Sequence, residues 1–188
     1  MPSEALLERL RKVRAVILDG DGVLFTGRVF VEPGRGEVMK ERSLIDGQGI
    51  SLLRAAGIRV AFFSGEATGF VEAVAEKLNR LPSVASGAWP PIAVVTGREG
   101  KDKASAAGEW LKGEGIEWSD SAAMGDDLSD AELLERVGLA ACPVNAHPII
   151  RGQCHFVATH GGGDGAIRDF ADALLGARGL DPRALARR

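Results

Sequence analysis

The sequence predicts an α/β fold in which helices are wound around both faces of a parallel, Rossmann-like sheet. Two observations support this fold class and its arrangement in a single domain. Short apolar and β-branched runs alternate with stretches of helical apolar spacing along the chain. No Pro/Ser-rich linker interrupts the 188 residues, so one domain covering residues 1–188 is expected. Because a strand, a crossover helix and the next strand connect with right-handed topology, the alternation indicates parallel strands.

The predicted elements follow one another in a regular order. An amphipathic helix at residues 1–12 has leucines spaced among charged residues. The strand runs are short and almost entirely apolar, which is typical of strands buried on both faces of a sheet. They are expected at residues 13–18, 58–63, 92–95, 122–124, 139–141 and 155–158. The remaining helices are expected at residues 49–56, 68–81, 102–112, 130–137 and 165–175.

One segment, residues 23–43, breaks the alternation. Its apolar positions have a period of two, and turn signals stand at Thr26-Gly27 and at residues 32–36 (EPGRG). This pattern predicts a protruding β-hairpin. Phe25, Val29 and Phe30 are expected to be its apolar surface.

The composition excludes several classes of function. The net charge is only −3 and the charges are interspersed, so no broad cationic surface is available for nucleic acid, and a small ligand is expected. No apolar run is long enough to span a membrane, and the first residues lack the uncharged stretch of a signal peptide. Two cysteines without CxxC spacing do not form a disulfide framework. A cytoplasmic location is therefore expected.

Polar residues directly follow the predicted strands. In an open parallel sheet, ligands bind beyond the carboxyl ends of the strands, so these positions form the candidate site. The first strand is followed by residues 19–22 (DGDG), the second by residues 64–66 (SGE) and the fourth by residues 125–130 (GDDLSD). Lys101 and Lys103 begin the helix after the third strand.

This set of residue types indicates phosphoryl chemistry. Carboxylates gathered at adjacent strand ends repel one another unless a cation neutralises them, and oxygen ligands suit a hard ion such as Mg²⁺. Lysine and serine then supply donors to phosphate oxygens. Alone, DGDG is equally well a turn, and Asp126-Asp127 a helix N-cap. The occurrence of all four segments, in order and each at a strand end, favours the functional interpretation.

The four segments resemble the motifs of the haloacid dehalogenase superfamily, which are matched by residues 19–23, Ser64, Lys103 and residues 125–130. The resemblance covers nearly all of the chain after Arg14. Residues 46–50, 136–139 and 162–169 are also similar to the branch without a cap domain. That branch includes the phosphatases of octulosonate 8-phosphate and nonulosonate 9-phosphate.

The resemblance implies a Mg²⁺-dependent phosphatase that works through an aspartyl-phosphate. Asp19 would be the nucleophile and a metal ligand. Asp21 would be the general acid and base, with its backbone carbonyl on the metal. Asp126 would complete the protein ligands. Ser64 and Lys103 would hold the phosphoryl oxygens.

Three further residues have supporting or competing roles in this comparison. Asp127 and Asp130 would support the metal site, directly or through water. Lys101 competes with Lys103 for the phosphate-binding role, and the family spacing to Gly125 favours Lys103.

The resemblance also implies a substrate class and an assembly. Gly65 and Glu66 are similar to the nonulosonate type, so a 2-keto-3-deoxy sugar acid phosphate of nine carbons is favoured over the eight-carbon homologue. A carboxylate that stabilises the next helix is the alternative role for Glu66. Val74 and Asp164 replace basic residues of relatives, which leaves Lys77 and Arg168 as basic candidates. A hairpin-mediated homotetramer would close the site that has no cap.

Two other functions are compatible with parts of this pattern. A catalytically silent oligomerisation or regulatory domain, like that attached to some sialic acid cytidylyltransferases, would share the fold. It is disfavoured because the residues expected to act in catalysis are all retained: Asp19, Asp21, Ser64, Lys103 and Asp126. A phospho-accepting receiver would need its acceptor aspartate after the third strand, where Thr96-Gly97 stands.

Overall fold

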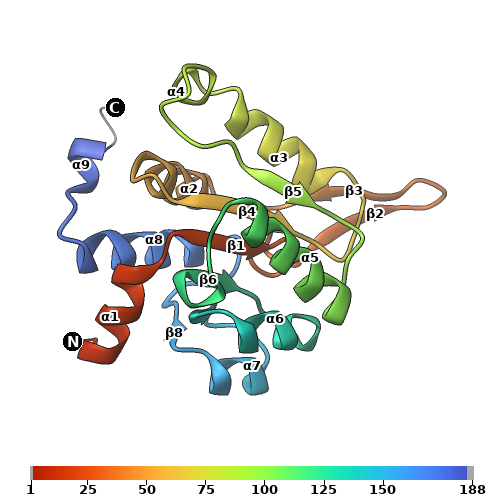
Figure 1. The fold of residues 1–188 in the computed structure, drawn as a ribbon. Helices are drawn as coiled ribbons and strands as arrows, with labels where there is room; N and C mark the ends of the chain where they lie inside the picture. Colours follow the sequence, from red (N-terminus) through yellow and green to blue (C-terminus); the bar gives the residue numbers. More distant parts are fainter. Residues whose placement is uncertain (1, 186–188) are drawn as a thin grey trace.

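The computed structural model describes residues 2–185, which form a six-stranded parallel sheet, a separate hairpin and surrounding helices (Figure 1). The strand order is β5-β4-β1-β6-β7-β8. The strands of this sheet are β1 (Ala15–Asp19), β4 (Arg59–Phe63), β5 (Ala93–Val95), β6 (Ser121–Met124), β7 (Leu139–Cys142) and β8 (Phe156–Val157). The predicted fold class is confirmed, and each of the six predicted strands is present.

Two layers of helices cover the sheet. One layer is α1 (Glu4–Lys12), α2 (Leu44–Ala55), α3 (Phe70–Asn79) and α8 (Ala166–Ala177). The other is α5 (Gly100–Gly113), α6 (Ala131–Arg136) and α7 (Pro148–Gln153). Two short helices, α4 (Pro82–Ala85) and α9 (Pro182–Leu185), and two 3-10 turns, η1 (Trp118–Asp120) and η2 (Leu128–Asp130), complete the helical elements described.

The sheet has a core on each face because successive strand residues point to opposite sides. Val16 and Leu18 of β1 contribute to the first core, whereas Ala15 and Ile17 contribute to the second. β1 lies between β4 and β6, in register with both, and all five of its residues are buried. This central position places the carboxyl end of β1, at Asp19, in the middle of the sheet edge.

Several predicted helix boundaries differ from the structure. α2 begins at Leu44 and not at residue 49, because Ser43 Oγ accepts a hydrogen bond from Ile45 N at 3.2 Å and caps the helix ahead of its glycines. The sequence did not predict α7. This helix has only six residues, which is too short to show a helical repeat of apolar positions. Met1 of the predicted first helix lies outside the described residues.

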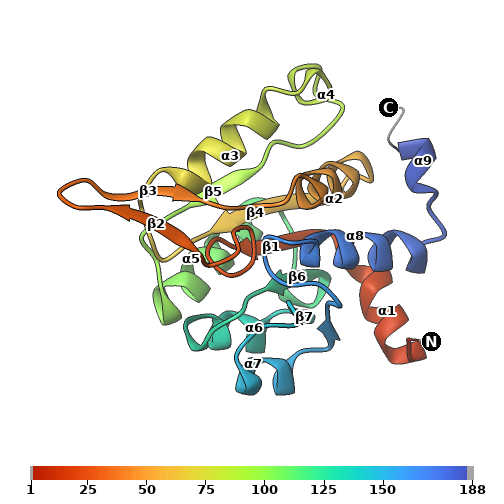
Figure 2. The same cartoon turned by 180° about the vertical axis from the view of Figure 1, so that it is seen from behind.

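The hairpin is shorter than predicted and consists of β2 (Val29–Glu32) and β3 (Gly36–Lys40). It projects well beyond the sheet (Figures 1 and 2). The expectation that Phe25 belongs to its exposed surface is wrong. Phe25 N donates to Gly20 O at 2.9 Å, so the chain turns after β1 and returns Phe25 to the core, where it packs edge-on against Phe70. Phe30 is exposed, as expected.

Among residues 2–185, no helix combines the length and the apolar character that crossing a bilayer would need.

Candidate active site

The carboxyl ends of β1, β4 and β6 and the first turn of α5 surround a polar cavity of about 310 Å³. The residues expected to act in catalysis, metal binding and substrate binding all line it, whereas Asp130, expected to support the metal site, is buried and is not part of its wall. The lining residues are Asp19, Asp21, Gly22, Thr26, Gly27, Ser64, Gly65, Glu66, Glu99, Lys103, Asp126, Asp127, Ser129 and Asn145. The parallel topology explains this convergence, since strand ends that are far apart in the sequence meet at one edge.

Lys103 lies at the centre of the buried part of the site. Its side chain is 2% exposed, and its Nζ donates to Asp19 Oδ1 and, at 2.6 Å, to Asp130 Oδ1. Lys101 is on the same helical turn but is exposed. Of the two lysines considered from the sequence, the structure therefore brings Lys103 into the site.

Three carboxylates form a cluster that could hold a metal ion. Asp19, Asp126 and Asp130 each place one oxygen within 4.8 Å of the other two. Asp130 also accepts hydrogen bonds from Lys103 Nζ and from Asp126 N, the latter at 3.0 Å. Both oxygens of Asp130 thus have protein partners, whereas Asp126 is less constrained. An all-oxygen donor set of this kind fits Mg²⁺.

The electrostatics of the cluster also favour a cation. Burial, and after it the charge of Asp130, raises the pKa of Asp19 to about 8, although Lys103 opposes this shift. Burial, followed by the charges of Asp130 and Asp127, raises the pKa of Asp126 to about 7. Each carboxyl group is therefore costly to ionise without a counterion, and a divalent ion would supply the missing charge.

Two glycines allow the backbone to pass close to these side chains. Gly22 has φ +81°, and a Cβ there would lie 2.0 Å from Asp126 Oδ2. Gly162, in the glycine-rich loop, approaches Gly22 so closely that a Cβ would lie 1.6 Å from Gly22 O. Gly163 N then donates to Val23 O at 2.7 Å. The glycine-rich loop is therefore packed onto the turn that follows the first strand.

The segment after β4 forms a second wall. Ser64 is 2% exposed, and its Oγ accepts from Glu66 N at 3.2 Å. A Cβ on Gly65 would lie 2.6 Å from Glu99 Oε1, so a larger residue there would displace the Glu99 side chain. Glu66 precedes the N-cap of α3, which is Gly69, and its carboxylate pairs with Lys40 at 3.1 Å.

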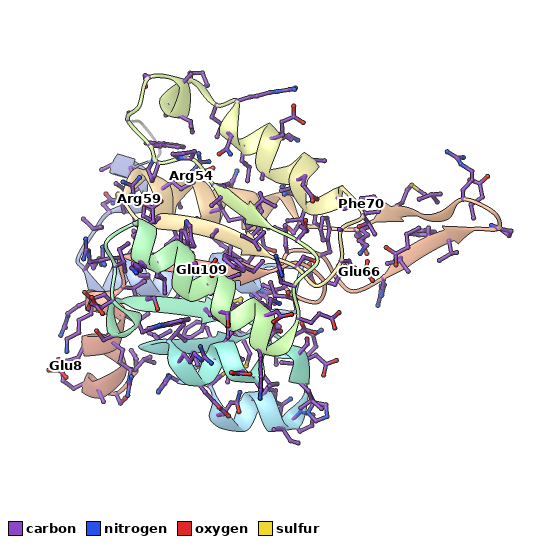
Figure 3. The ribbon with its side chains drawn as sticks, turned by 45° about the vertical axis from the view of Figure 1, so that its right-hand side comes forward. Glu8, Arg54, Arg59, Glu66, Phe70 and Glu109 are labelled. Atoms are coloured by element: carbon purple, nitrogen blue, oxygen red, sulfur yellow. The ribbon has the colours of Figure 1, made fainter. Side chains whose placement is uncertain are left out.

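Lys40 is the main residue that the sequence analysis missed. It comes from the hairpin, whose sequence has no motif that indicates a site residue, and its Nζ lies 2.8 Å from both carboxylate oxygens of Asp21. Figure 3 shows Glu66 and Phe70 at the base of the hairpin, where Lys40 meets them. Thr26, Glu99 and Asn145 also line the cavity and had no distinctive sequence signal.

Comparisons with known proteins identify the family of this chain. The profile of the haloacid dehalogenase-like hydrolases matches residues 65–168. The 3-deoxy-D-manno-octulosonate 8-phosphate phosphatase of Salmonella typhi is 30% identical over 178 residues, which cover 94% of this chain and 87% of that protein.

Two solved structures have the same fold over nearly the whole chain. A hypothetical protein from Xanthomonas campestris has a TM-score of 0.86 and 31% identity, covering 98% of this chain and 93% of the other. The cobalt-bound deoxy-D-mannose-octulosonate 8-phosphate phosphatase of Haemophilus influenzae has a TM-score of 0.82 and 26% identity, covering 96% and 99%. The resemblance seen in the sequence motifs is confirmed: this chain belongs to the haloacid dehalogenase-like hydrolase family.

Proposed function

We propose that this chain is a Mg²⁺-dependent phosphomonoesterase that hydrolyses the phosphate ester of a 2-keto-3-deoxy sugar acid. The main supporting observation is that Asp19, Lys103 and Asp126, from three separate segments, meet at one polar cavity with Ser64 on its wall. Relatives named as phosphatases of a sugar acid phosphate, one of them metal-bound, support the same reaction.

The proposed mechanism assigns a separate task to each side chain. Asp19 attacks phosphorus and forms an aspartyl-phosphate, while Asp21, in its protonated form, delivers a proton to the leaving alkoxide. Asp21 then removes a proton from the water that hydrolyses this intermediate. Lys103 and Ser64 hold the phosphoryl oxygens in both steps. Bound Mg²⁺, held by Asp19, the backbone carbonyl of Asp21 and Asp126, would neutralise charge on the transferring group.

The buried contact between Lys103 and Asp19 supports the role of Asp19. The lysine places a fixed positive charge beside the carboxylate, at the position where phosphate charge would also have to be held. Asp130 orients this lysine from the other side at 2.6 Å. Asp130 therefore supports the site through Lys103 and through the backbone of Asp126.

The Asp19→Asn variant tests this function. We expect it to bind substrate but to release no phosphate from octulosonate 8-phosphate or nonulosonate 9-phosphate in the presence of Mg²⁺, because an amide cannot act as the nucleophile. Glu109→Gln, an exposed position on α5, serves as the matched control. Turnover by Asp19→Asn close to that of the control would exclude the covalent mechanism.

We further propose that the acid end of the substrate lies in an adjoining cavity of about 470 Å³. This cavity shares Thr26 and Asn145 with the candidate active site, and Arg28 and Arg42 are among its lining residues. Arginine is well suited to a carboxylate. The two basic candidates from the sequence line neither cavity: Lys77 is exposed on α3, and Arg168 forms an ion pair with Asp172 at 2.8 Å.

The preference for nine carbons and the homotetramer are also proposals. Glu66, at the rim of the cavity, supports the first because its carboxylate can accept hydrogen bonds from hydroxyls of the longer substrate. Val29, Phe30, Val31 and Met39 support the second, since they leave an apolar surface on a hairpin that projects from the fold. A cytoplasmic location stays a prediction from the sequence.

A further inference from the structure

Lys40 joins the hairpin to Asp21 and Glu66, two carboxylates that line the active-site cavity, and also pairs with Glu37 within the hairpin. Its Nζ lies 2.8 Å from each oxygen of Asp21, 3.1 Å from Glu66 Oε2 and 3.1 Å from Glu37 Oε2. The same nitrogen is 5.6 Å from the centre of the Phe70 ring. Its side chain is only 2% exposed, although the hairpin around it is largely open to solvent.

This environment keeps Lys40 positively charged. Burial alone would lower its pKa, but the hydrogen bonds to Asp21, Glu37 and Glu66 raise it above the ordinary value for lysine. A buried ammonium group is costly to desolvate unless neighbouring carboxylates neutralise it. Its position at this point of the hairpin is therefore determined by the carboxylates it contacts.

Lys40 is not part of the wall of the active-site cavity, whereas Asp21 and Glu66 line it directly. Lys40 lies behind these two carboxylates. We therefore expect Lys40 to affect catalysis through Asp21 and Glu66.

We propose that Lys40 is a positioning residue that holds the carboxyl group of Asp21 in place for proton transfer, and that it makes the hairpin part of the catalytic apparatus. This rests on the proposed function, in which Asp21 is the acid and base. The contacts to both oxygens, each 2.8 Å long, tie the carboxyl group of Asp21 to the hairpin. A general acid contributes about 10²- to 10⁴-fold to rate, and that contribution depends on its placement.

A comparison of leaving groups separates positioning from a structural role. A sugar phosphate releases an alkoxide and needs the proton of Asp21, whereas p-nitrophenyl phosphate releases a stable anion and does not. Lys40→Met is therefore expected to lower kcat for the sugar phosphate about 100-fold or more with little change in KM. The burst of nitrophenolate, which reports only the attack of Asp19, is expected to change less than about threefold.

Two controls make this result interpretable. Lys101→Met removes an exposed lysine and is expected to match the wild type in both assays. In a double-mutant cycle, Lys40→Met added to Asp21→Asn is expected to cause no further loss with the sugar phosphate, because the residue it positions is already disabled. A partly unfolded population would instead lower the burst and the turnover together.

The outcomes distinguish this proposal from the proposed function. Equal losses in the burst and in sugar phosphate turnover, or additive losses in the double variant, would mean that Lys40 only maintains the fold. Unchanged turnover in Lys40→Met would also overturn the proposal. A wild-type chain that hydrolyses neither phosphate would refute the proposed function itself, and the role of Lys40 with it.

Discussion

The affinity of this chain for Mg²⁺ is predicted to rise steeply with pH. In the metal-free site, burial and the charge of Asp130 raise the pKa of Asp19 to about 8. Burial and the charges of Asp130 and Asp127 raise that of Asp126 to about 7. Below these values each carboxyl group holds a proton. A bound Mg²⁺ needs both groups as carboxylates, so binding must release those protons.

The slope of this dependence follows from the two pKa values. Each displaced proton makes the apparent association constant rise about tenfold per pH unit. Below pH 7, roughly, two protons are displaced and the affinity should rise about 100-fold per unit. Between about pH 7 and 8 only Asp19 still contributes, so the rise falls to about tenfold, and above about pH 8 the affinity should level off. Lys103 adds no step, because the charges of Asp19 and Asp130 raise its pKa against the effect of burial.

Isothermal titration calorimetry can measure both the affinity and the protons released. Titrations of Mg²⁺ into metal-free protein at several pH values, each in two buffers of different ionisation enthalpy, give these quantities directly. Asp126→Asn should bind more weakly and release one proton fewer at acidic pH. Glu109→Gln, with an exposed carboxylate on α5, should match the wild type. An affinity that is constant from pH 5.5 to 7.5 would refute the assigned cluster.

Four further results are expected. The pKa of Asp19 is raised in the folded state, so protonated Asp19 stabilises the fold at acidic pH and this contribution is lost as the pH rises toward about 8. The Tm measured in chelator should therefore fall over that pH range, and added Mg²⁺ should restore it. Glu66→Arg should change the ratio of kcat/KM for the nine- and eight-carbon substrates about ten- to a hundredfold, and an unchanged ratio would remove Glu66 from substrate recognition. Phe30→Ser, which alters an exposed hairpin position, should shift the assembly toward smaller species in solution scattering, and a fully active wild-type monomer would contradict this. Arg54→Met should lower the free energy of unfolding, measured in urea, by about 2–4 kcal/mol. Arg54 is fully buried, and its guanidinium group donates to Pro90 O at 2.7 Å and to Leu78 O at 3.2 Å. The control Arg80→Met, at an exposed position, should change the free energy of unfolding little.

The sheet and its edge were predictable because they depend on strong local signals. Buried parallel strands leave continuous apolar runs, and the residue after each run falls at the same edge of the sheet. Asp19, Ser64 and Asp126 were found in this way. The choice between Lys101 and Lys103 was harder, because the two are close in sequence and only packing decides which one is buried.

Elements without a repeating signal were placed wrongly or missed. Helix α7 has six residues, too few to establish a helical period, and begins at a proline that is equally common in turns. Phe25 follows DGDG with an alternating pattern that resembles a strand. Its position in the core depends on the hydrogen bond from Phe25 N to Gly20 O, which has no signature in the residue types.

The position of Lys40 shows why the hairpin side of the site required coordinates. In a regular strand, residues three apart face opposite sides, so Glu37 and Lys40 should point away from each other. The ladder instead pairs Phe30 with Met39 but Val31 with Glu37, which leaves Val38 as an extra residue in β3. This bulge returns Glu37 to the face of Lys40, and their side chains meet at 3.1 Å. A period-two pattern cannot reveal a bulge, because one extra residue reverses every later assignment of faces. The bulge thus places the carboxylate of Glu37 beside Lys40. A regular ladder that kept Val38 as a paired residue would turn Glu37 to the opposite face, whereas deleting Val38 would leave Glu37 two positions before Lys40 and on the same face.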